Sequence, residues 1–157
     1  MNAPPVLPRT PATGLELFES YRAGRLEPVG VAALLEIRFL EVEDGRIVLA
    51  CDTRGAFANP LGLLDGGIAA TLLDSAMGAA VHTTLPASQA YSSLDISVRH
   101  IRSGTIDGGE LRAEGRVMHR GRKVRTAEAT LHDEAGRLIA TATSSLMVHP
   151  FGQSAPV

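Results

Sequence analysis

The stretch that decides the fold is residues 59–80, which read NPLGLLDGGIAATLLDSAMGAA. A helix running from Gly66 to Val81 is apolar on nearly every side, and such a helix is expected to lie buried in a core. Small or polar residues recur along it at spacings of three and four, which places them on one narrow face. This stripe consists of Gly67, Thr71, Asp74, Ser75 and Gly78.

A carboxylate, that of Asp74, stands in the middle of the stripe. Burying a charge is costly unless the charge is paired, hydrogen-bonded or neutralised, so Asp74 needs either a partner or a function. One interpretation is a structural salt bridge or a hydrogen bond to the backbone. The other is a general base or nucleophile with a tuned pKa. The stripe alone does not decide between the two.

The start of the helix is a second candidate feature, because Gly66 and Gly67 leave its first backbone N–H groups uncovered at the positive end of the dipole. The oxyanion of an acyl-transfer reaction could dock there, although a tight loop-to-helix turn is the alternative. Asp74 follows Gly66 by roughly 12 Å along the axis, at about 1.5 Å per residue. If both groups act on one carbonyl carbon, they must come from two antiparallel copies of the helix, which predicts a dimer.

Strand-like segments flank the helix on both sides. Before it, apolar residues alternate with charged ones from Leu35, and the turn Glu43-Asp44-Gly45 leads into a second alternating run, which predicts a hairpin. After it come four further runs separated by short, turn-prone links, as expected of an antiparallel meander. These runs cover about 91–102, 109–119, 122–132 and 137–149.

The chain is organised as one domain between two tails. Residues 1–12 form a Pro-rich segment that we expect to be a flexible tail, residues 13–150 form the domain, and residues 151–157 form a C-terminal tail. The domain opens with Thr13 and Glu16, a capping box that predicts a short amphipathic helix ending near Gly24. The fold class is therefore α+β, with a curved antiparallel sheet of about five to six strands wrapped around a central helix.

Composition narrows the functional classes. The net charge of −2 over 157 residues and the absence of Trp disfavour nucleic acid as a partner. No apolar run approaches the roughly 20 residues that cross a bilayer, so we expect no membrane contact. Cys51 is the one cysteine, which excludes an intrachain disulfide, fits the cytoplasm and indicates a buried small hydrophobe. The five histidines lack metal-ligand spacing, so we expect no metal site.

The stretch 59–80, with the later turns HRGRK (119–123) and HDEAGRL (132–138), resembles the hot-dog fold acyl-CoA thioesterases, and particularly the phenylacetyl-CoA and 4-hydroxybenzoyl-CoA thioesterase group. The similarity runs from about Val31 to Val148. It implies that the long helix lies inside the curved sheet. It also implies that two subunits join their sheets edge to edge as a homodimer, often pairing again into a homotetramer.

The resemblance also implies roles for three residues. The acidic nucleophile or general base falls on Asp74, and the backbone amide that polarises the thioester carbonyl falls on Gly66. The side-chain amide that positions substrate or water falls on Asn59 of the neighbouring subunit. Two positions depart from the pattern: Asp65 stands where a His is usual, and is expected to cap the helix, while Gly78 stands where a hydroxyl is common.

Several further residues are substrate-binding candidates. Thr71 or Ser75 could replace the hydroxyl missing at Gly78, or could bond a carbonyl one turn back. Basic residues around the turn at 119–125 could hold the phosphates of coenzyme A, although a solvated surface is the default. Serines after the helix stand where relatives line the acyl or pantetheine channel. The predicted substrate-binding set is Asp65, Gly67, Ser75, Gly78, Ser92, Ser93, Arg120, Arg122 and Lys123.

These observations favour an acyl-CoA thioesterase that hydrolyses an aryl- or medium-chain acyl-CoA, with coenzyme A as part of the substrate and no separate cofactor. One alternative is a hot-dog protein that binds acyl-CoA with weak catalysis. Another is a hot-dog hydratase or dehydratase, which needs a histidine beside the acid. Only His82 is near the helix in sequence, and its position indicates a partner for the C-terminal dipole rather than a base.

Overall fold

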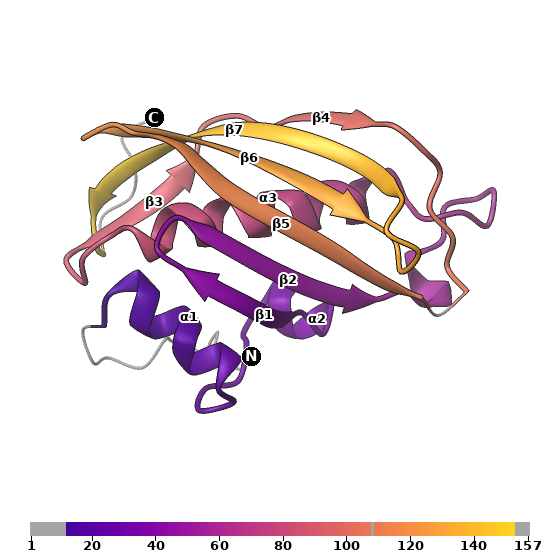
Figure 1. Ribbon diagram of the computed structural model, residues 1–157, viewed down its shortest axis with the longest axis horizontal. Coiled ribbons are helices and arrows are strands. Elements are labelled where there is room, and N and C mark those ends of the chain that lie inside the picture. The colour runs from indigo at the N-terminus through magenta and orange to yellow at the C-terminus, as the bar shows by residue number, and fades with distance from the viewer. Residues whose placement is uncertain (1–11, 108, 153–157) are drawn as a thin grey trace.

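A long helix held inside a curved sheet dominates the computed structural model, which describes residues 12–107 and 109–152. This helix, α3 (Gly66–Thr83), runs along the concave face of the sheet (Figure 1). Leu72, Leu73 and Met77 are fully buried, and α3 contacts β2, β5, β6 and β7 as well as α1. The predicted buried helix is therefore confirmed.

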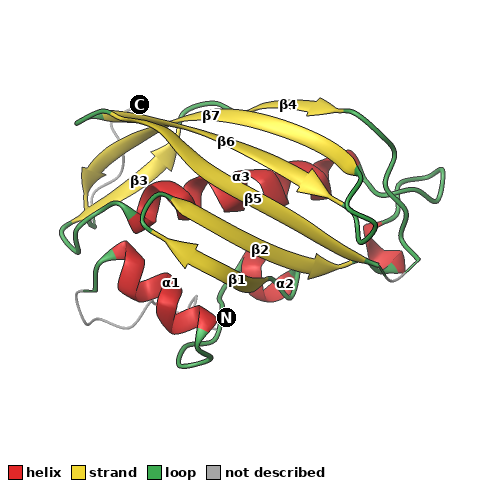
Figure 2. Ribbon diagram, viewed as in Figure 1, coloured by secondary structure: helices red, strands yellow, loops and turns green. Residues whose placement is uncertain are grey.

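The described residues form seven strands of one antiparallel sheet, which Figure 2 shows in yellow around the red α3. Its order is β1-β2-β5-β6-β7-β3, and β4 also pairs with β7, so β3 and β4 share one position. The expected hairpin and meander are both present. The strands are β1 (Arg38–Glu43), β2 (Arg46–Asp52), β3 (Gln89–Ser93), β4 (Ser97–His100), β5 (Glu110–Arg120), β6 (Val124–His132) and β7 (Leu138–Pro150).

Two predicted strand boundaries differ from the structure. The run expected over 91–102 is broken between β3 and β4, because the backbone carbonyl of Asp95 accepts a hydrogen bond from Ser144 Oγ and its carboxylate accepts one from the amide of Ser145. The first strand begins at Arg38 rather than Leu35. The residues before it form the single helical turn α2 (Val31–Leu34), after which Glu36 adopts a positive φ of 54°.

The N-terminal helix α1 (Gly14–Arg22) closes one end of the fold (Figure 1). Its predicted capping box is present, since Thr13 Oγ1 accepts from the Glu16 amide and the Glu16 carboxylate accepts from the Thr13 amide. Phe18 packs against Phe39 of β1 and against the edge of His82 near the end of α3. The helix thus seals the core beside the C-terminus of α3.

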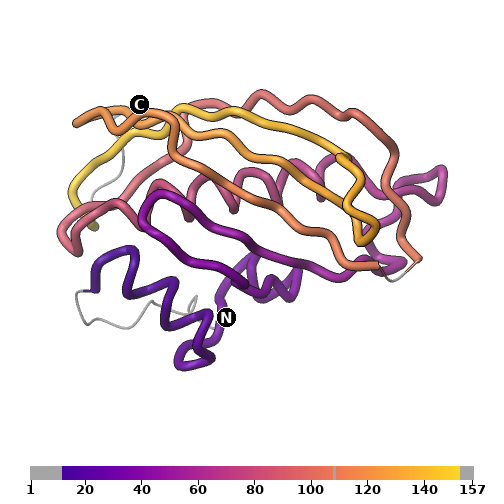
Figure 3. Tube along the Cα trace, viewed as in Figure 1, coloured from indigo at the N-terminus to yellow at the C-terminus, as the bar shows by residue number. Residues whose placement is uncertain are grey.

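The two predicted tails fall mostly outside the described residues, which begin at Ala12 and end at Gly152. Between β2 and α3 the chain passes through the short 3-10 helix η1 (Gly55–Phe57) and a loop over 58–64. Figure 3 shows this magenta loop projecting beyond the sheet at the start of α3. None of the helices within 12–107 and 109–152 is long and apolar enough to cross a membrane.

The sheet comes closest to α3 at Gly115 in the middle of β5. A Cβ at this position would lie 2.2 Å from the carbonyl oxygen of Ala76 and 2.9 Å from the amide nitrogen of Met77. These are backbone atoms of a buried helix, which cannot rotate away as a side chain does. Glycine is therefore required for the observed separation of β5 and α3.

We predict that Gly115→Ala destabilises the fold by about 1–3 kcal/mol, because the added methyl group forces the sheet and helix apart. Gly55→Ala is the matched control, since a Cβ there meets no atom within 4 Å. Urea unfolding monitored by circular dichroism measures both. Equal midpoints for Gly115→Ala and the wild type would contradict this packing.

Candidate active site

The start of α3 is built as the sequence predicts. Asp65 is the N-cap, and its Oδ1 accepts a hydrogen bond from the amide of Gly67 at 2.8 Å. No residue among those described accepts a hydrogen bond from the amide of Gly66, which is partly exposed. The cap therefore uses the second amide of the helix and leaves the first one available to a ligand carbonyl.

The loop before the helix is held by Asn59. Its Oδ1 accepts hydrogen bonds from the amides of Leu61 and Leu63, at 2.9 and 3.2 Å, and its backbone amide donates to the carbonyl of Leu63 at 2.8 Å. A bridge between Ala58 and Leu64 closes the loop. The side-chain oxygen of Asn59 is thus committed to loop structure, so the role proposed for this residue in binding falls to its Nδ2 group.

A histidine that has no local signal in the sequence lies beside Gly66. His100, at the end of β4, places its Cε1 and Nε2 atoms 3.3 Å from the point where a Gly66 Cβ would stand. Both residues line a pocket of about 310 Å³ together with Leu64, Ala69, Arg102 and Gly104. His100 follows Gly66 by 34 residues, so nothing in the sequence indicates that the two are neighbours. Only the pairing of β4 with β7 brings His100 to the start of α3.

Asp74 receives its hydrogen bond from the sheet rather than from a cation. Ser93, the last residue of β3, donates from Oγ to Asp74 Oδ1 at 3.1 Å. Asp74 forms no ion pair within the described ranges. The described residues therefore offer this carboxylate no salt bridge, and the candidate Ser93 is its direct neighbour. Ser92 points elsewhere, with its Oγ 3.0 Å from His149 Nε2.

The rest of the polar stripe divides into bonded and open positions. Thr71 Oγ1 donates to the carbonyl of Gly67 at 2.9 Å, the bond one turn back that the sequence allowed. Ser75 is partly buried beside Asp74 on α3. Gly78 is buried beneath the ring of Tyr91 in β3, so that a Cβ there would lie 2.4 Å from the Tyr91 hydroxyl oxygen. The hydroxyl proton of Thr71 is therefore committed to the helix backbone.

Gly66 and Asp74 belong to two separate groups of candidate residues on one chain, which we call candidate half-sites. The first half-site comprises the free amide of Gly66 with Asp65, His100 and the loop held by Asn59. The second comprises Asp74 with Ser93 and Tyr91, two turns further along α3. Gly66 and Asp74 are eight positions apart on α3, or about 12 Å along the axis at 1.5 Å per residue.

The predicted phosphate-binding residues lie around the β5–β6 turn. Arg120 is committed to an ion pair with Asp44, with 2.8 Å between Nη1 and Oδ2. Arg125 donates to the backbone carbonyl and the hydroxyl of Thr84, just after α3. Arg122 and Lys123 are exposed and form no ion pair with any described residue. They are the two cations of the cluster open to an anionic ligand.

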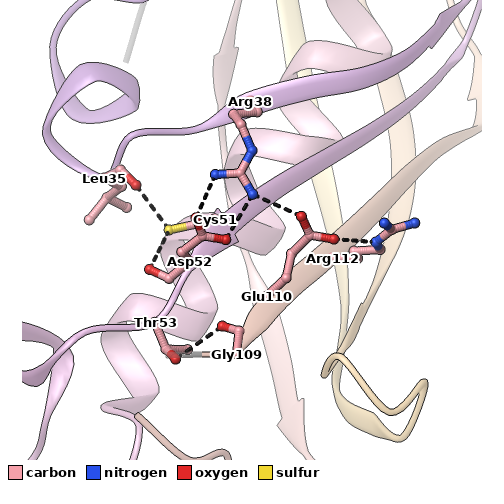
Figure 4. Close-up of polar contacts among 8 residues, drawn as sticks. All are labelled: Leu35, Arg38, Cys51, Asp52, Thr53, Gly109, Glu110 and Arg112. Atoms are coloured by element: carbon pink, nitrogen blue, oxygen red, sulfur yellow. Dashed lines mark hydrogen bonds and ion pairs between the residues drawn. The ribbon is translucent and has the colours of Figure 1, made fainter. Parts of the chain in front are cut away.

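Cys51 is a buried structural residue, as predicted. It is 0% exposed in β2, and Figure 4 shows its sulfur directed at the backbone carbonyl of Leu35, at 2.9 Å. Burial raises the pKa of its thiol, which disfavours the nucleophilic thiolate. The neighbouring Asp52 instead joins an exposed ion-pair chain with Arg38, Glu110 and Arg112.

His82 belongs to an aromatic cluster. Its ring packs edge-on against Phe18 and Tyr91, with centroids 5.7 and 5.6 Å away. Burial lowers its pKa, so the imidazole is uncharged at neutral pH. An uncharged ring cannot be the cationic dipole partner expected from its place in the last turn. No group of three or more His, Cys, Asp or Glu within 12–107 and 109–152 is placed to hold a metal.

Residues 61–140, half of the chain, match the family model of the thioesterase superfamily. The chain belongs to the thioesterase superfamily, and it is a thioester hydrolase with the hot-dog fold. The fold class and the enzyme class predicted from the sequence are thus confirmed.

Curated proteins and a solved structure agree with this assignment. The 1,4-dihydroxy-2-naphthoyl-CoA hydrolase of Escherichia coli K12 is 27% identical over 108 residues, which is 69% of this chain and 78% of that protein. The medium/long-chain acyl-CoA thioesterase YigI of Salmonella typhimurium LT2 is 34% identical over 97 residues, or 55% of this chain and 63% of that protein. The crystal structure of a phenylacetic acid degradation-related protein from Ralstonia eutropha JMP134 matches with a TM-score of 0.75 at 29% identity. The match covers 83% of this chain and 98% of that chain.

Substitutions of Asp65 separate the effect of its helix-capping hydrogen bond from the effect of its negative charge. We predict that Asp65→Ala destabilises the protein by about 1 kcal/mol through loss of the bond to the Gly67 amide. Asp65→Asn should keep stability near wild type, because asparagine caps a helix about as well as aspartate. Urea unfolding of the three proteins measures this; equal losses in both variants would show that the charge, and not the cap, stabilises α3.

Proposed function

We propose that this protein hydrolyses the thioester bond of aryl- or medium-chain acyl-CoA molecules. The observation that carries the proposal is the carboxylate of Asp74, which is partly buried and hydrogen-bonded by Ser93 while forming no ion pair among the described residues. Such a carboxylate has no neighbouring cation bound to it and is placed to act as a general base or a nucleophile. The substrate class is supported by similarity to a naphthoyl-CoA hydrolase and to a medium/long-chain acyl-CoA thioesterase.

In the proposed reaction, the Gly66 amide donates to the thioester oxygen and stabilises the negative charge that forms there. Asp74 either removes a proton from the attacking water or attacks the carbonyl carbon itself, with water then cleaving the anhydride. In both cases the carbon–sulfur bond breaks and the thiolate of coenzyme A takes up a proton. The free acid and coenzyme A are the products.

The proposed assembly is a dimer in which each site joins the Gly66 end of one helix with Asp74 of the other. The edge of β4 that faces away from β7 pairs with no described strand, so a second copy can extend the sheet there. Apolar side chains gather at this edge: Leu94 is 50% exposed, Ile96 41% and Ile101 49%. Burial of these side chains would favour pairing of two copies. Pairing of dimers into a tetramer remains part of the proposal.

We place the nucleotide end of coenzyme A near Arg122 and Lys123, whose exposed cations suit phosphate groups. Hydration of an enoyl-CoA is the second candidate reaction, and the specific observation that favours it is His100 beside the Gly66 amide. Hydrolysis is preferred because the chain belongs to the thioesterase superfamily. Absorbance of the enoyl thioester during incubation distinguishes hydration from thiol release.

We predict that Asp74→Asn lowers kcat for acyl-CoA hydrolysis by about 10²–10⁴-fold, because an amide neither accepts the proton nor attacks the carbonyl. Thiol release from phenylacetyl-CoA, 4-hydroxybenzoyl-CoA and octanoyl-CoA measures the rate. Asp107→Asn is the matched control, since Asp107 is exposed outside both half-sites. Wild-type turnover in Asp74→Asn would exclude Asp74 as the catalyst.

The shared site can be tested with hybrid dimers of Asn59→Ala and Asp74→Asn chains. Each variant alone should be weak, because both of its sites carry the same defect. In a hybrid, one site combines the intact Asn59 and the intact Asp74, so about half of the wild-type activity should return. Purified, verified hybrids carrying two different tags give the measurement, and an activity no higher than that of the two parents would contradict a site shared between chains.

A further inference from the structure

Position 78 on α3 lacks a side chain, yet the space above it is filled. Gly78 lies one helical turn after Asp74, on the same face. A Cβ at this position would lie 2.4 Å from the hydroxyl oxygen of Tyr91 and 2.8 Å from its Cε2 and Cζ atoms. The phenol of Tyr91 therefore occupies the place that a side chain at position 78 would take.

The geometry of β3 explains how the hydroxyl arrives there. Tyr91 and Ser93 are two residues apart in the strand, so both point to the face that covers α3. Two residues of a strand span roughly 6.8 Å, while four residues of a helix span about 6 Å. The strand therefore presents one hydroxyl to Asp74, through Ser93, and a second one turn further along, through Tyr91.

The Tyr91 hydroxyl is a neutral group with unused hydrogen-bonding capacity. No group within residues 12–107 and 109–152 forms a hydrogen bond with it. Its burial, followed by the negative charge of Asp74, raises the pKa of Tyr91 to about 12, so the phenol stays protonated at the pH of an assay. The ring is held edge-on against the uncharged His82, with 5.6 Å between centroids. The Tyr91 hydroxyl is thus fixed and neutral, and it lies close enough to the Asp74 carboxylate to respond to its charge.

We propose that Tyr91 positions the hydrolytic water for Asp74, in place of a hydroxyl that residue 78 cannot provide. The water donates one hydrogen to the Asp74 carboxylate and the other to the Tyr91 oxygen. Its lone pair then points at the acyl carbon: the new carbon–oxygen bond forms, Asp74 takes the proton, and the thiolate leaves. If Asp74 attacks first and the thiolate leaves, the same water attacks the anhydride, Asp74 is released as a carboxylate, and the proton of the water passes to the thiolate of coenzyme A. This role rests on the proposed thioesterase function.

Tyr91→Phe tests the role, because it removes the hydroxyl and keeps the ring against His82. We expect kcat to fall about 10–100-fold, the cost of a misplaced reactant, with little change in KM or in the urea midpoint. Tyr21→Phe is the matched control, since it alters the other tyrosine of the chain, on α1 beside Phe39. A kcat within twofold of wild type in Tyr91→Phe overturns the proposal.

A rescue experiment separates the hydroxyl from packing. Tyr91→Ala removes the three atoms nearest to a Cβ at position 78, so Gly78→Ser and Gly78→Ala can each be added to it. The two double variants have nearly equal volume and differ in one hydroxyl. We expect the Ser variant to recover about tenfold in kcat over the Ala variant. Equal rates in the two would overturn the positioning role.

A titration reports on the pair of residues independently of turnover. In a Tyr21→Phe background, absorbance at 295 nm follows Tyr91 alone, with circular dichroism confirming the fold. Asp74→Asn removes a negative charge that opposes ionisation, so the pKa of Tyr91 should fall; an unchanged pKa contradicts their proximity. If Asp74→Asn retains wild-type turnover, the proposed function fails and the water-positioning role fails with it. If only Tyr91→Phe retains it, the function stands and the role of Tyr91 is wrong.

Discussion

The burial of α3 is the constraint on which the rest of this structure depends. Leu72, Leu73, Ala76 and Met77 are fully buried, so the helix must be covered along most of its circumference, and a flat sheet cannot do this. The strands therefore curve around it, and β5 approaches so closely that Gly115 has no room for a side chain. Between residues 66 and 81, the polar groups of α3 are confined to one stripe and to the helix start, which carry the two candidate half-sites.

The parts of this arrangement that depend on neighbours in sequence were predictable. The capping box at Thr13, the cap at Asp65 and the apolar length of α3 all arise within a few residues, and the structure has each of them. Alternation likewise predicted the hairpin and the β5–β6–β7 meander. The turn of helix at 31–34 was missed because it is only four residues long and no side chain caps its start, so it has no local signal of the kind that marks α1 and α3.

The features that depend on pairing between distant parts of the chain could not be predicted from the sequence. The break between β3 and β4 arises from bonds between Asp95 and residues of β7, nearly 50 positions later. His100 reaches Gly66, and Ser93 reaches Asp74, because β3 and β4 share one sheet position beside α3. The stripe on α3 identified one side of each half-site. The other side comes from strands whose register no local pattern fixes.

The contact between Gly78 and Tyr91 also has a consequence for how this sequence can drift. A single substitution at position 78 places an atom inside the phenol, while loss of the phenol alone leaves a void beside α3. A side chain at position 78 destabilises the fold while Tyr91 is present and is tolerated once Tyr91 is lost. Loss of Tyr91 likewise destabilises the fold while position 78 is glycine and is tolerated once a side chain fills the space, so the two positions are epistatic. An evolutionary exchange between a helix-borne hydroxyl and a strand-borne one must therefore pass through a less stable intermediate, or change both residues together.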